Sequence, residues 1–269
     1  FRGSTVGGIG RTWAQGARIP LPPLPDQRRI ADILDRADNL RGQRRRAIQM
    51  LDELVTSTFL ADFGSLGDEP EVYVSDLVDS SNGGIRTGPF GSDLLHSEFV
   101  DEGIAVLGID NIVGNTFSWA KPRFITAEKY KQLQRYTVRP DDVVITIMGT
   151  VGRCAVIPSD IGTAINTKHL CCISLDRELC EPEYLHHYFL KHPRARKYLA
   201  SVSKGAIMDG LNMSIIRSMP VRLPGLAEQR AFVSKLKKAD QLMAQHLQHL
   251  ANLDELFASL QHLAFQGEL

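Results

Sequence analysis

Polar and cationic side chains gather in glycine-rich segments in the middle of the chain. Arg86-Thr-Gly-Pro-Phe-Gly-Ser92 is punctuated by glycines, and Ala164-Ile-Asn-Thr-Lys-His169 places Asn, Thr, Lys and His together before an expected strand. Arginine and lysine suit guanine edges and phosphates, and asparagine suits adenine. These segments therefore predict contacts with DNA, although many surface loops have a similar composition.

The side chains that we expect to contact DNA fall into two groups. Residues in the polar loops are expected to reach base edges, and basic residues near the end of a helix are expected to meet phosphates. Each of them could equally have a structural role. The first group comprises Ser92, Thr150, Asn166, Lys168, His169, Lys204 and Asn212, and the second comprises Arg194 and Lys197. Arg86 is a further residue that we expect to contact DNA.

Catalytic signatures are missing from the same region. No glycine fingerprint, Walker loop or His-Glu-x-x-His motif occurs. Ser201-Val-Ser-Lys204 matches the short pattern of acyl-serine enzymes, but its companion motifs are missing. Neither the scattered histidines nor the four cysteines have metal-ligand spacing. We therefore expect no catalytic residue, metal or cofactor, and the alternative is an enzyme with an unrecognised site.

The elements that would position these loops are marked by an internal repeat. Residues 19–64 and 221–266 are similar in sequence and form an internal repeat with an offset of 202 positions. Ala37-Asp38-x-Leu40 matches Ala239-Asp240-x-Leu242, and Leu51-Asp-Glu-Leu54 matches Leu253-Asp-Glu-Leu256. A period of this length describes a module of one globular unit and one long helix, caught between two copies of that helix.

Both copies predict long amphipathic helices that begin after proline-rich or glycine-containing segments, with Asp26 and Glu228 at their N-termini. The second helix is expected from about Ala227 to Ala264, a rod of about 55 Å. Its heptad seam is apolar except for His246, and Arg41 and Arg44 interrupt the seam of the first copy. The seam positions predict that the two helices pair as an antiparallel coiled coil. In the second copy they are Phe232, Leu236, Ala239, Met243, His246, Leu250, Leu253, Phe257, Leu260 and Ala264; in the first they are Ile30, Leu34, Ala37, Arg41, Arg44, Ile48, Leu51, Val55 and Thr58.

The segment between the helices predicts an α+β domain. Val143–Ile147 and Arg153–Ile157 are strand-like runs on either side of a turn, and residues 104–109 and 169–175 are further expected strands. Thr126 and Pro182 each begin an expected helix, and the helix that begins at Pro182 reaches about Ser201. The match of Gly3 and Gly8 to Gly205 and Gly210 indicates that the chain begins inside an earlier globular unit. We expect residues 1–18 to be the tail of that unit, 19–65 a first helical region, 66–220 the globular domain and 221–269 a second helical region.

Composition limits the class of protein. The formal net charge of zero argues against a protein that coats nucleic acid nonspecifically. It does not exclude a protein that reads a DNA sequence through a local basic surface. No run of about 18 apolar residues occurs, which predicts no membrane span. Free cysteines indicate a reducing, cytoplasmic location.

Three features together resemble the specificity (S) subunit of type I restriction–modification enzymes. They are the entry 19–28 with its copy 223–230, the segment Gly88-Pro-Phe-Gly-Ser92-x-Leu94, and the hairpin Pro140–Gly152. The second copy departs from the pattern, with Gly225 and Ala227 where the first has prolines. The resemblance implies that the globular unit is a target recognition domain, which reads one half of a bipartite site in double-stranded DNA. It also implies helices that dock modification (M) subunits, while a separate restriction (R) subunit cuts.

The same resemblance directs attention to the outer faces of the helices. Leu40, Leu54, Leu242 and Leu256 are expected to lie outside the seam and to bind M subunits or a second copy of the chain. Two copies would carry identical domains and would read a palindromic site with a nonspecific gap. A coiled-coil adaptor without DNA binding is the third alternative.

Overall fold

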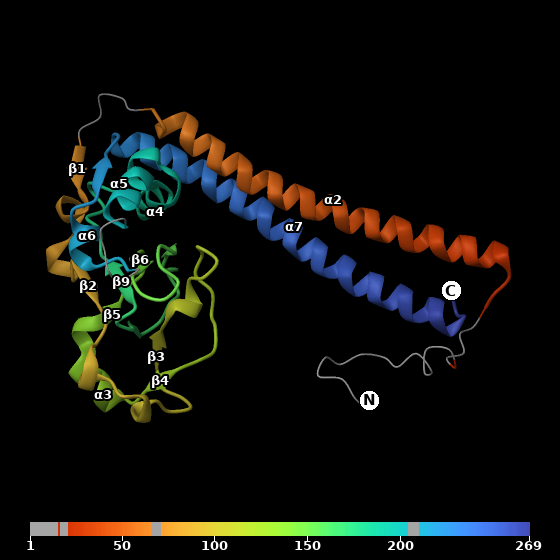
Figure 1. Ribbon diagram of the computed structural model, residues 1–269, viewed down its shortest axis with the longest axis horizontal. Coiled ribbons are helices and arrows are strands. Elements are labelled where there is room, and N and C mark those ends of the chain that lie inside the picture. Colours follow the sequence, from red (N-terminus) through yellow and green to blue (C-terminus); the bar gives the residue numbers. More distant parts are fainter. Residues whose placement is uncertain (1–15, 17–20, 66–70, 204–209) are drawn as a thin grey trace. The chain divides into compact units, whose positions relative to one another are not determined.

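The protein is described by a computed structural model, in which residues 16, 21–65, 71–203 and 210–269 are placed (Figure 1). The chain forms two compact units. One contains the described residues up to Leu54 together with Lys238–Leu269, and the other contains Val55–Lys237. Apart from residue 16, the predicted tail 1–18 lies outside the described residues.

Two long helices, α2 (Leu24–Phe63) and α7 (Leu226–Gln266), confirm the helices predicted from the repeat. Pro22 and Pro23 precede α2 because proline cannot donate within a helix. At the start of α7, the Glu228 carboxylate accepts a hydrogen bond from the Gly225 amide at 3.0 Å. The side chains of Arg29 and Lys235 reach Leu269 and Asp62 respectively, so the helices run antiparallel (Figure 1).

In the unit that holds residues up to Leu54, the predicted seam is the face along which α2 and α7 meet. Arg44 and His246 occupy equivalent positions of the repeat and approach each other at 3.2 Å. Arg41 donates to Asp254 at 2.6 Å and lies over the Phe257 ring at 4.2 Å. The two arginines that interrupt the seam therefore pair with polar groups across it. All predicted seam positions in this unit are buried or half-buried, namely Ile30, Leu34, Ala37, Arg41, Arg44, Ile48 and Leu51 on α2, and Ala239, Met243, His246, Leu250, Leu253, Phe257, Leu260 and Ala264 on α7.

Inside the other unit, the ends of the same helices belong to the globular core. The Phe59 and Phe232 rings lie 5.4 Å apart, and Phe63 meets Tyr184 edge-on at 5.2 Å. Phe59, Phe232 and Leu236 are almost completely buried. The helices are thus anchored in this unit by aromatic packing.

The described residues of the globular unit form three small sheets. The first has the strand order β2-β9-β6-β7, all antiparallel, and the second has the order β4-β3-β8-β5, in which β3 and β8 are parallel. The third sheet pairs β1 with β10. The strands are β1 (Glu71–Tyr73), β2 (Ile85–Thr87), β3 (Ile104–Leu107), β4 (Phe124–Ile125), β5 (Thr137–Val138), β6 (Val143–Thr146), β7 (Cys154–Val156), β8 (Ala164–Asn166), β9 (Leu170–Ile173) and β10 (Pro220–Arg222). The predicted strands are confirmed as β3, β6, β7 and β9.

Short helices complete the unit: α3 (Ala127–Leu133), α4 (Pro182–Lys191), α5 (Pro193–Ser203) and α6 (Met213–Arg217). Thr126 caps α3, as predicted, by accepting from the Lys129 amide. The single helix predicted from Pro182 to about Ser201 is wrong. It divides at His192, which takes an extended conformation before Pro193. Single turns of 3₁₀ helix connect the strands: η1 (Val74–Leu77), η2 (Ser80–Asn82), η3 (Gly91–Asp93), η4 (His96–Glu98), η5 (Ile109–Asn111) and η6 (Gln134–Tyr136).

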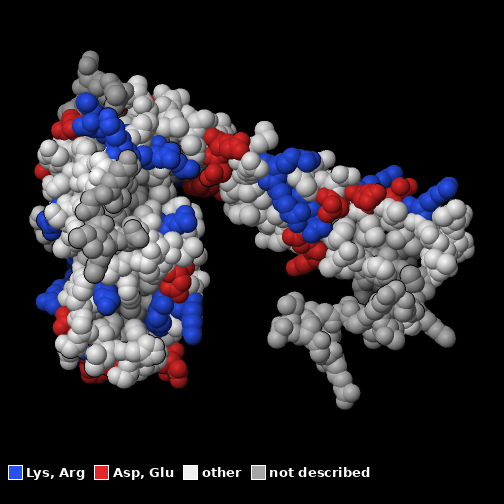
Figure 2. All heavy atoms as spheres, in the orientation of Figure 1, with Lys and Arg blue, Asp and Glu red and all other residues white. Residues whose placement is uncertain are grey.

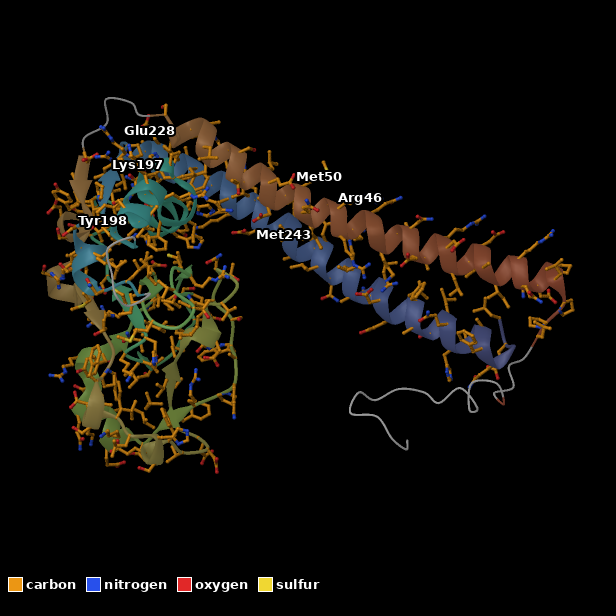
Figure 3. All side chains as sticks on the ribbon, viewed as in Figure 1. Arg46, Met50, Lys197, Tyr198, Glu228 and Met243 are labelled. Carbon is orange, nitrogen blue, oxygen red and sulfur yellow. The ribbon has the colours of Figure 1, made fainter. Side chains whose placement is uncertain are left out.

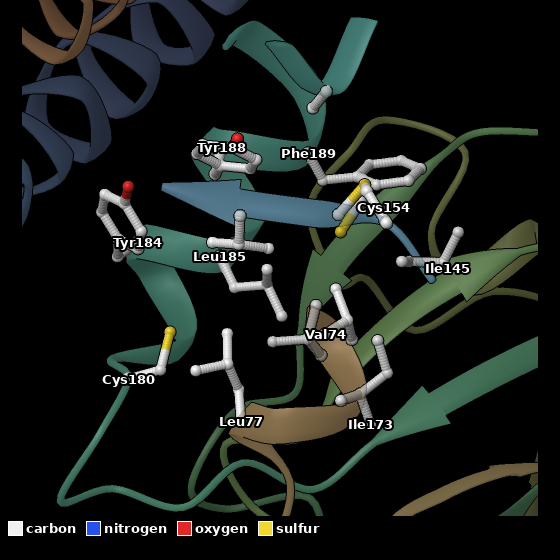
Figure 4. Packing of buried hydrophobic residues seen from close by; sticks show 14 of the residues in the cluster. Val74, Leu77, Ile145, Cys154, Ile173, Cys180, Tyr184, Leu185, Tyr188 and Phe189 are labelled. Atoms are coloured by element: carbon white, nitrogen blue, oxygen red, sulfur yellow. The ribbon is translucent and has the colours of Figure 1, made fainter. Parts of the chain in front are cut away.

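The main core lies between α4 and the first sheet. Tyr184, Leu185 and Tyr188 of α4 face Ile145 and Ile173 of the sheet (Figure 4). The four cysteines are buried and unpaired, and burial raises the pKa of the Cys171 and Cys180 thiols to about 12. Within the part of the chain that is described, no helix is long and apolar enough to cross a membrane.

Candidate nucleic-acid interface

The loops that follow four strands of the globular unit converge at one place, which we call the loop cluster. It comprises residues 88–96 after β2, 108–119 after β3, 147–153 after β6 and 167–169 after β8. The Thr167 amide donates to Leu107 O at 2.9 Å, and the Ile147 amide donates to His169 O at 2.9 Å. The carboxyl ends of these strands thus hold loops distant in sequence against one another.

Close backbone packing explains two of the glycines in the cluster. A Cβ atom on Gly88 would lie 2.0 Å from Asn166 O, so a larger residue there would push the 88–96 loop away from 167–169. Gly149 has a positive φ of 73°, and a Cβ atom there would lie 2.8 Å from Ile109. Glycine is required at such close approaches. The glycine punctuation noted in the sequence therefore sets the distance between the loops.

A cavity of about 750 Å³ opens in the loop cluster. Its apolar wall is formed by Leu94, Phe99, Ile109 and Val113. Its polar wall is formed by residues of both signs, namely His96, Asp110, Arg123, Lys168 and His169. A concave apolar surface with a few convergent polar groups is typical of a binding site.

Lys168 and His169, both predicted from the sequence, line this cavity and are half-buried. Burial lowers the pKa of the His169 imidazole, and the nearby charges of Lys168 and Arg123 lower it further. His169 is therefore held neutral, with one ring nitrogen as donor and the other as acceptor. The cavity combines fixed positive charge with a neutral hydrogen-bonding ring.

Ser92 and Thr150 are exposed on the rim of the loop cluster. Ser92 lies in η3, and Thr150 lies in the turn between β6 and β7, where its carbonyl accepts from the Thr146 hydroxyl. Both hydroxyl groups are accessible to a ligand.

Arg86 requires a correction. Its side chain is 9% exposed, and its Nη2 donates to Asp142 Oδ2 at 2.6 Å and also to Thr137 O. Its Nη1 donates to the Ser174 hydroxyl at 2.9 Å. A buried arginine with these partners ties β2 to neighbouring strands, and its guanidinium is engaged within the fold instead of facing a ligand.

Asn166 also requires a correction. Its side chain is fully buried, and its amide nitrogen donates to Leu170 O at 2.9 Å, which closes the turn between β8 and β9. Its Oδ1 has no hydrogen-bond partner among the described residues. Asn166 shapes the turn that presents Lys168 and does not itself reach a base.

Asn212 is not among the residues that line the cavity. Asn212 is exposed, and its Oδ1 accepts from the Ile215 amide at 2.9 Å, so it caps α6. Lys204 lies outside the residues that the structure describes.

Arg194 and Lys197 occupy a separate surface on α5. Figure 2 shows Lys and Arg atoms gathered over this helix, and Figure 3 places Lys197 and Tyr198 there. Arg194 donates to Glu71 at 2.7 Å, and this hydrogen bond raises the pKa of Arg194. Lys197 is exposed. The pairing with Glu71 leaves Lys197 as the better phosphate ligand of the two.

Sequence reasoning missed Asp110 and Arg123. They lie near the two ends of the connection between β3 and β4 and form an ion pair at 2.5 Å on the cavity wall. They are 13 positions apart in the sequence, and neither belongs to a motif, so no local pattern singled them out. Only the fold brings them beside Lys168 and His169.

The outer faces of α2 and α7 carry the four predicted leucines, all exposed: Leu40 by 47%, Leu54 by 56%, Leu242 by 48% and Leu256 by 49%. Antiparallel pairing puts Leu40 level with Leu256, and Leu54 level with Leu242. Met50 on α2 is likewise exposed, whereas Met243 lies in the seam (Figure 3). Exposed apolar residues that form a contiguous patch are typical of a protein-binding surface.

Residues 101–252 match the family model of the type I restriction modification DNA specificity domain. The chain belongs to this family. Among the described residues, no group of three or more His, Cys, Asp or Glu side chains could hold a metal ion.

A specificity-domain relative is the type I restriction enzyme EcoBI specificity subunit of Escherichia coli. It is 25% identical over 98% of this chain, which spans 61% of that protein. The HsdS subunit from Thermoanaerobacter tengcongensis has a TM-score of 0.55 at 22% identity, with 100% of this chain and 65% of that chain covered. A chain from a type I R-M system, solved in connection with complex assembly and conformational transition, has a TM-score of 0.62 at 22% identity, with 93% and 62% covered. These structures share the fold, and the present chain spans less than two thirds of each relative.

Proposed function

We propose that the chain is the DNA sequence-recognition subunit of a type I restriction–modification complex, and that its globular unit reads one half of a bipartite site. The observation that carries this proposal is the loop cluster, because a specificity-domain fold there brings Ser92, Thr150, Lys168 and His169 to one surface. The chain itself is non-catalytic in this proposal and takes no cofactor.

The chemistry of the loop cluster fits a base-pair edge in double-stranded DNA. Lys168 can donate to guanine, and neutral His169 can donate or accept. The apolar wall with Ile109 and Val113 can contact a thymine methyl group. Lys197 on α5 lies outside the cavity and is assigned to a phosphate.

The paired helices provide the docking surface in this proposal. The exposed leucines Leu40, Leu54, Leu242 and Leu256 form an apolar surface for M subunits, through which the R subunit joins, or for a second copy of the chain. A pair of copies would place identical domains about one helix length apart and would require a palindromic site with a nonspecific gap. The half-sites would then be separated by about one to one and a half turns of DNA.

Selection of bound duplexes from a random library, performed with the chain in complex with an M subunit, tests DNA recognition. A gapped motif is expected, and equal binding of all sequences would support the coiled-coil adaptor instead. Incubating the isolated chain with a labelled methyl donor and DNA tests the enzyme alternative. Turnover by the chain alone would contradict the proposal.

Two lysines separate base contacts from phosphate contacts. Lys168→Ala is expected to relax one position of the motif at a cost of about 1–3 kcal/mol. Lys197→Ala is expected to weaken all sequences alike and to lower the salt slope by about 1. If Lys168→Ala leaves the motif unchanged, the assignment of the 167–169 loop to base reading fails.

A further inference from the structure

Arg123 and Asp110 form an ion pair on the wall of the loop-cluster cavity that sequence reasoning did not anticipate. Arg123 Nη2 donates to Asp110 Oδ1 at 2.5 Å, and Nε makes a long contact of 3.5 Å with Val106 O. Both contacts engage the Nε/Nη2 edge of the guanidinium. A guanidinium has five donors, and within the described part of the chain those on Nη1 have no hydrogen-bond partner.

The backbone around the pair is built for it. A Cβ atom on Gly108 would lie 2.4 Å from Arg123 Nη2 and 2.8 Å from Asp110 Oδ1. The Gly108 amide donates to Asn111 Oδ1 at 2.9 Å, which fixes the turn that carries Asp110. The Val106 amide donates to Arg123 O at 2.9 Å, so the main chain of Arg123 is bound to β3. The absence of a side chain at 108 thus makes room for the guanidinium beside the carboxylate.

Exposure and surroundings indicate that the pair serves more than stability. The Arg123 side chain is 29% exposed and the Asp110 side chain 40%, so both reach the cavity opening. A pair this exposed contributes little to folding. Lys168 and His169 line the same cavity, and the charge of Arg123 contributes to the lowered pKa of His169. Arg123 therefore belongs to the group of side chains that face a ligand in the loop cluster.

We propose that Arg123 is a specificity-determining residue that reads a guanine, and that Asp110 is the positioning residue that holds its free edge toward the DNA. This inference rests on the proposed function. A guanine presents O6 and N7 as two adjacent acceptors, which match the Nη1/Nη2 edge of an arginine. An arginine fixed in advance by a carboxylate loses less conformational freedom on binding than a mobile one.

The test compares affinities of the complex of this chain and its M subunit for the motif duplex and for duplexes substituted at each position. Arg123→Ala is expected to weaken binding to the motif by about 5- to 150-fold and to abolish the preference for guanine at one base pair. Asp110→Asn and Gly108→Ala are expected to reduce the preference at that same base pair by smaller factors. Thermal unfolding of each variant shows whether the fold is retained. If Arg123→Ala is unstable, Asp110→Asn and Gly108→Ala still test the inference, because they retain Arg123 and alter only its position.

Arg177→Ala is the matched control. Arg177 donates to Asp141 at 2.9 Å, with both side chains about half exposed, and also to the buried Glu181 at 2.5 Å. Asp141 precedes β6, opposite the end that enters the loop cluster. This variant is expected to leave all affinities unchanged. Weakening of every duplex alike by Arg123→Ala would make Arg123 a phosphate contact and overturn the inference, as would an unchanged motif. A wild-type complex without any sequence preference would overturn the proposed function, and this inference with it.

Discussion

Helices α2 and α7 contact each other in two different settings. Near the globular unit, Phe59, Phe232 and Leu236 are almost completely buried among residues of α4 and the sheets. Between Ile30 and Leu51, the seam residues of α2 are only half-buried, apart from the buried Ala37. The repeat predicts which face of each helix meets its partner. It does not predict depth of burial, because that depends on elements that pack against only one end of the helix pair.

Two ion pairs of the same length provide the comparison with the largest expected difference. Arg86–Asp142 and Arg41–Asp254 both measure 2.6 Å, but the Asp142 side chain is 2% exposed and the Asp254 side chain 44%. Arg86→Ala leaves a buried carboxylate unpaired and is expected to cost about 3–5 kcal/mol. Arg41→Ala is expected to cost about 1 kcal/mol. Urea denaturation of both variants measures the difference, and equal losses would contradict the contrast in burial.

Two leucines at equivalent positions of the repeat compare the apolar contribution. Leu236 is 8% exposed in the globular core, whereas Leu34 is half-buried in the seam. Leu236→Ala is expected to lower the free energy of unfolding by about 2–5 kcal/mol, because the cavity cannot collapse. Leu34→Ala should cost about 1 kcal/mol, since less apolar area is lost. Hydrogen exchange within each unit follows the two effects separately, and a larger loss for Leu34→Ala would sink this account.

Acid is expected to weaken the globular unit through His187. Burial lowers the pKa of this imidazole to about 4, with a further contribution from His186. The unfolded chain binds a proton near its ordinary pKa of about 6.5, so stability is complete above that pH and is lost as pH falls toward 4. The loss from this group is at most about 3 kcal/mol. Urea midpoints measured at intervals from pH 7.5 to pH 4 should fall, and His187→Gln should flatten the slope. A slope unchanged by that substitution would assign the acid sensitivity elsewhere.

The smallest effect on stability is expected at the exposed leucines. Leu54→Asp combined with Leu256→Asp should lower the free energy of unfolding by about 1 kcal/mol or less, because about half of each side chain is already exposed. The same pair should abolish capture of the M subunit, or self-association, measured by light scattering. Asn39→Asp with Gln241→Asp adds the same charge at exposed neighbouring positions and should leave capture intact. Capture that survives the leucine substitutions would exclude this face as the docking surface.

The contrast between the helices and the loops also explains how much the sequence predicted. The seam from Ile30 to Ala264 followed from heptad spacing because helix packing is periodic. Lys168 and His169 were found because they stand together before a strand, and the structure brings them to one cavity. Arg86 and Asn166 belong to the same two polar segments, 86–92 and 164–169, yet lie buried. Arg123 and Asp110 were missed, since only tertiary contacts bring them into the cavity.

Methylome sequencing of a strain with the gene and of the same strain without it tests the central claim most directly. If the loop cluster reads DNA for a type I complex, one gapped methylated motif is expected to disappear with the gene. Restoring the gene with Lys168→Ala should return the motif with one position relaxed. Identical methylomes in the presence and absence of the gene would contradict the claim that this chain specifies a DNA sequence.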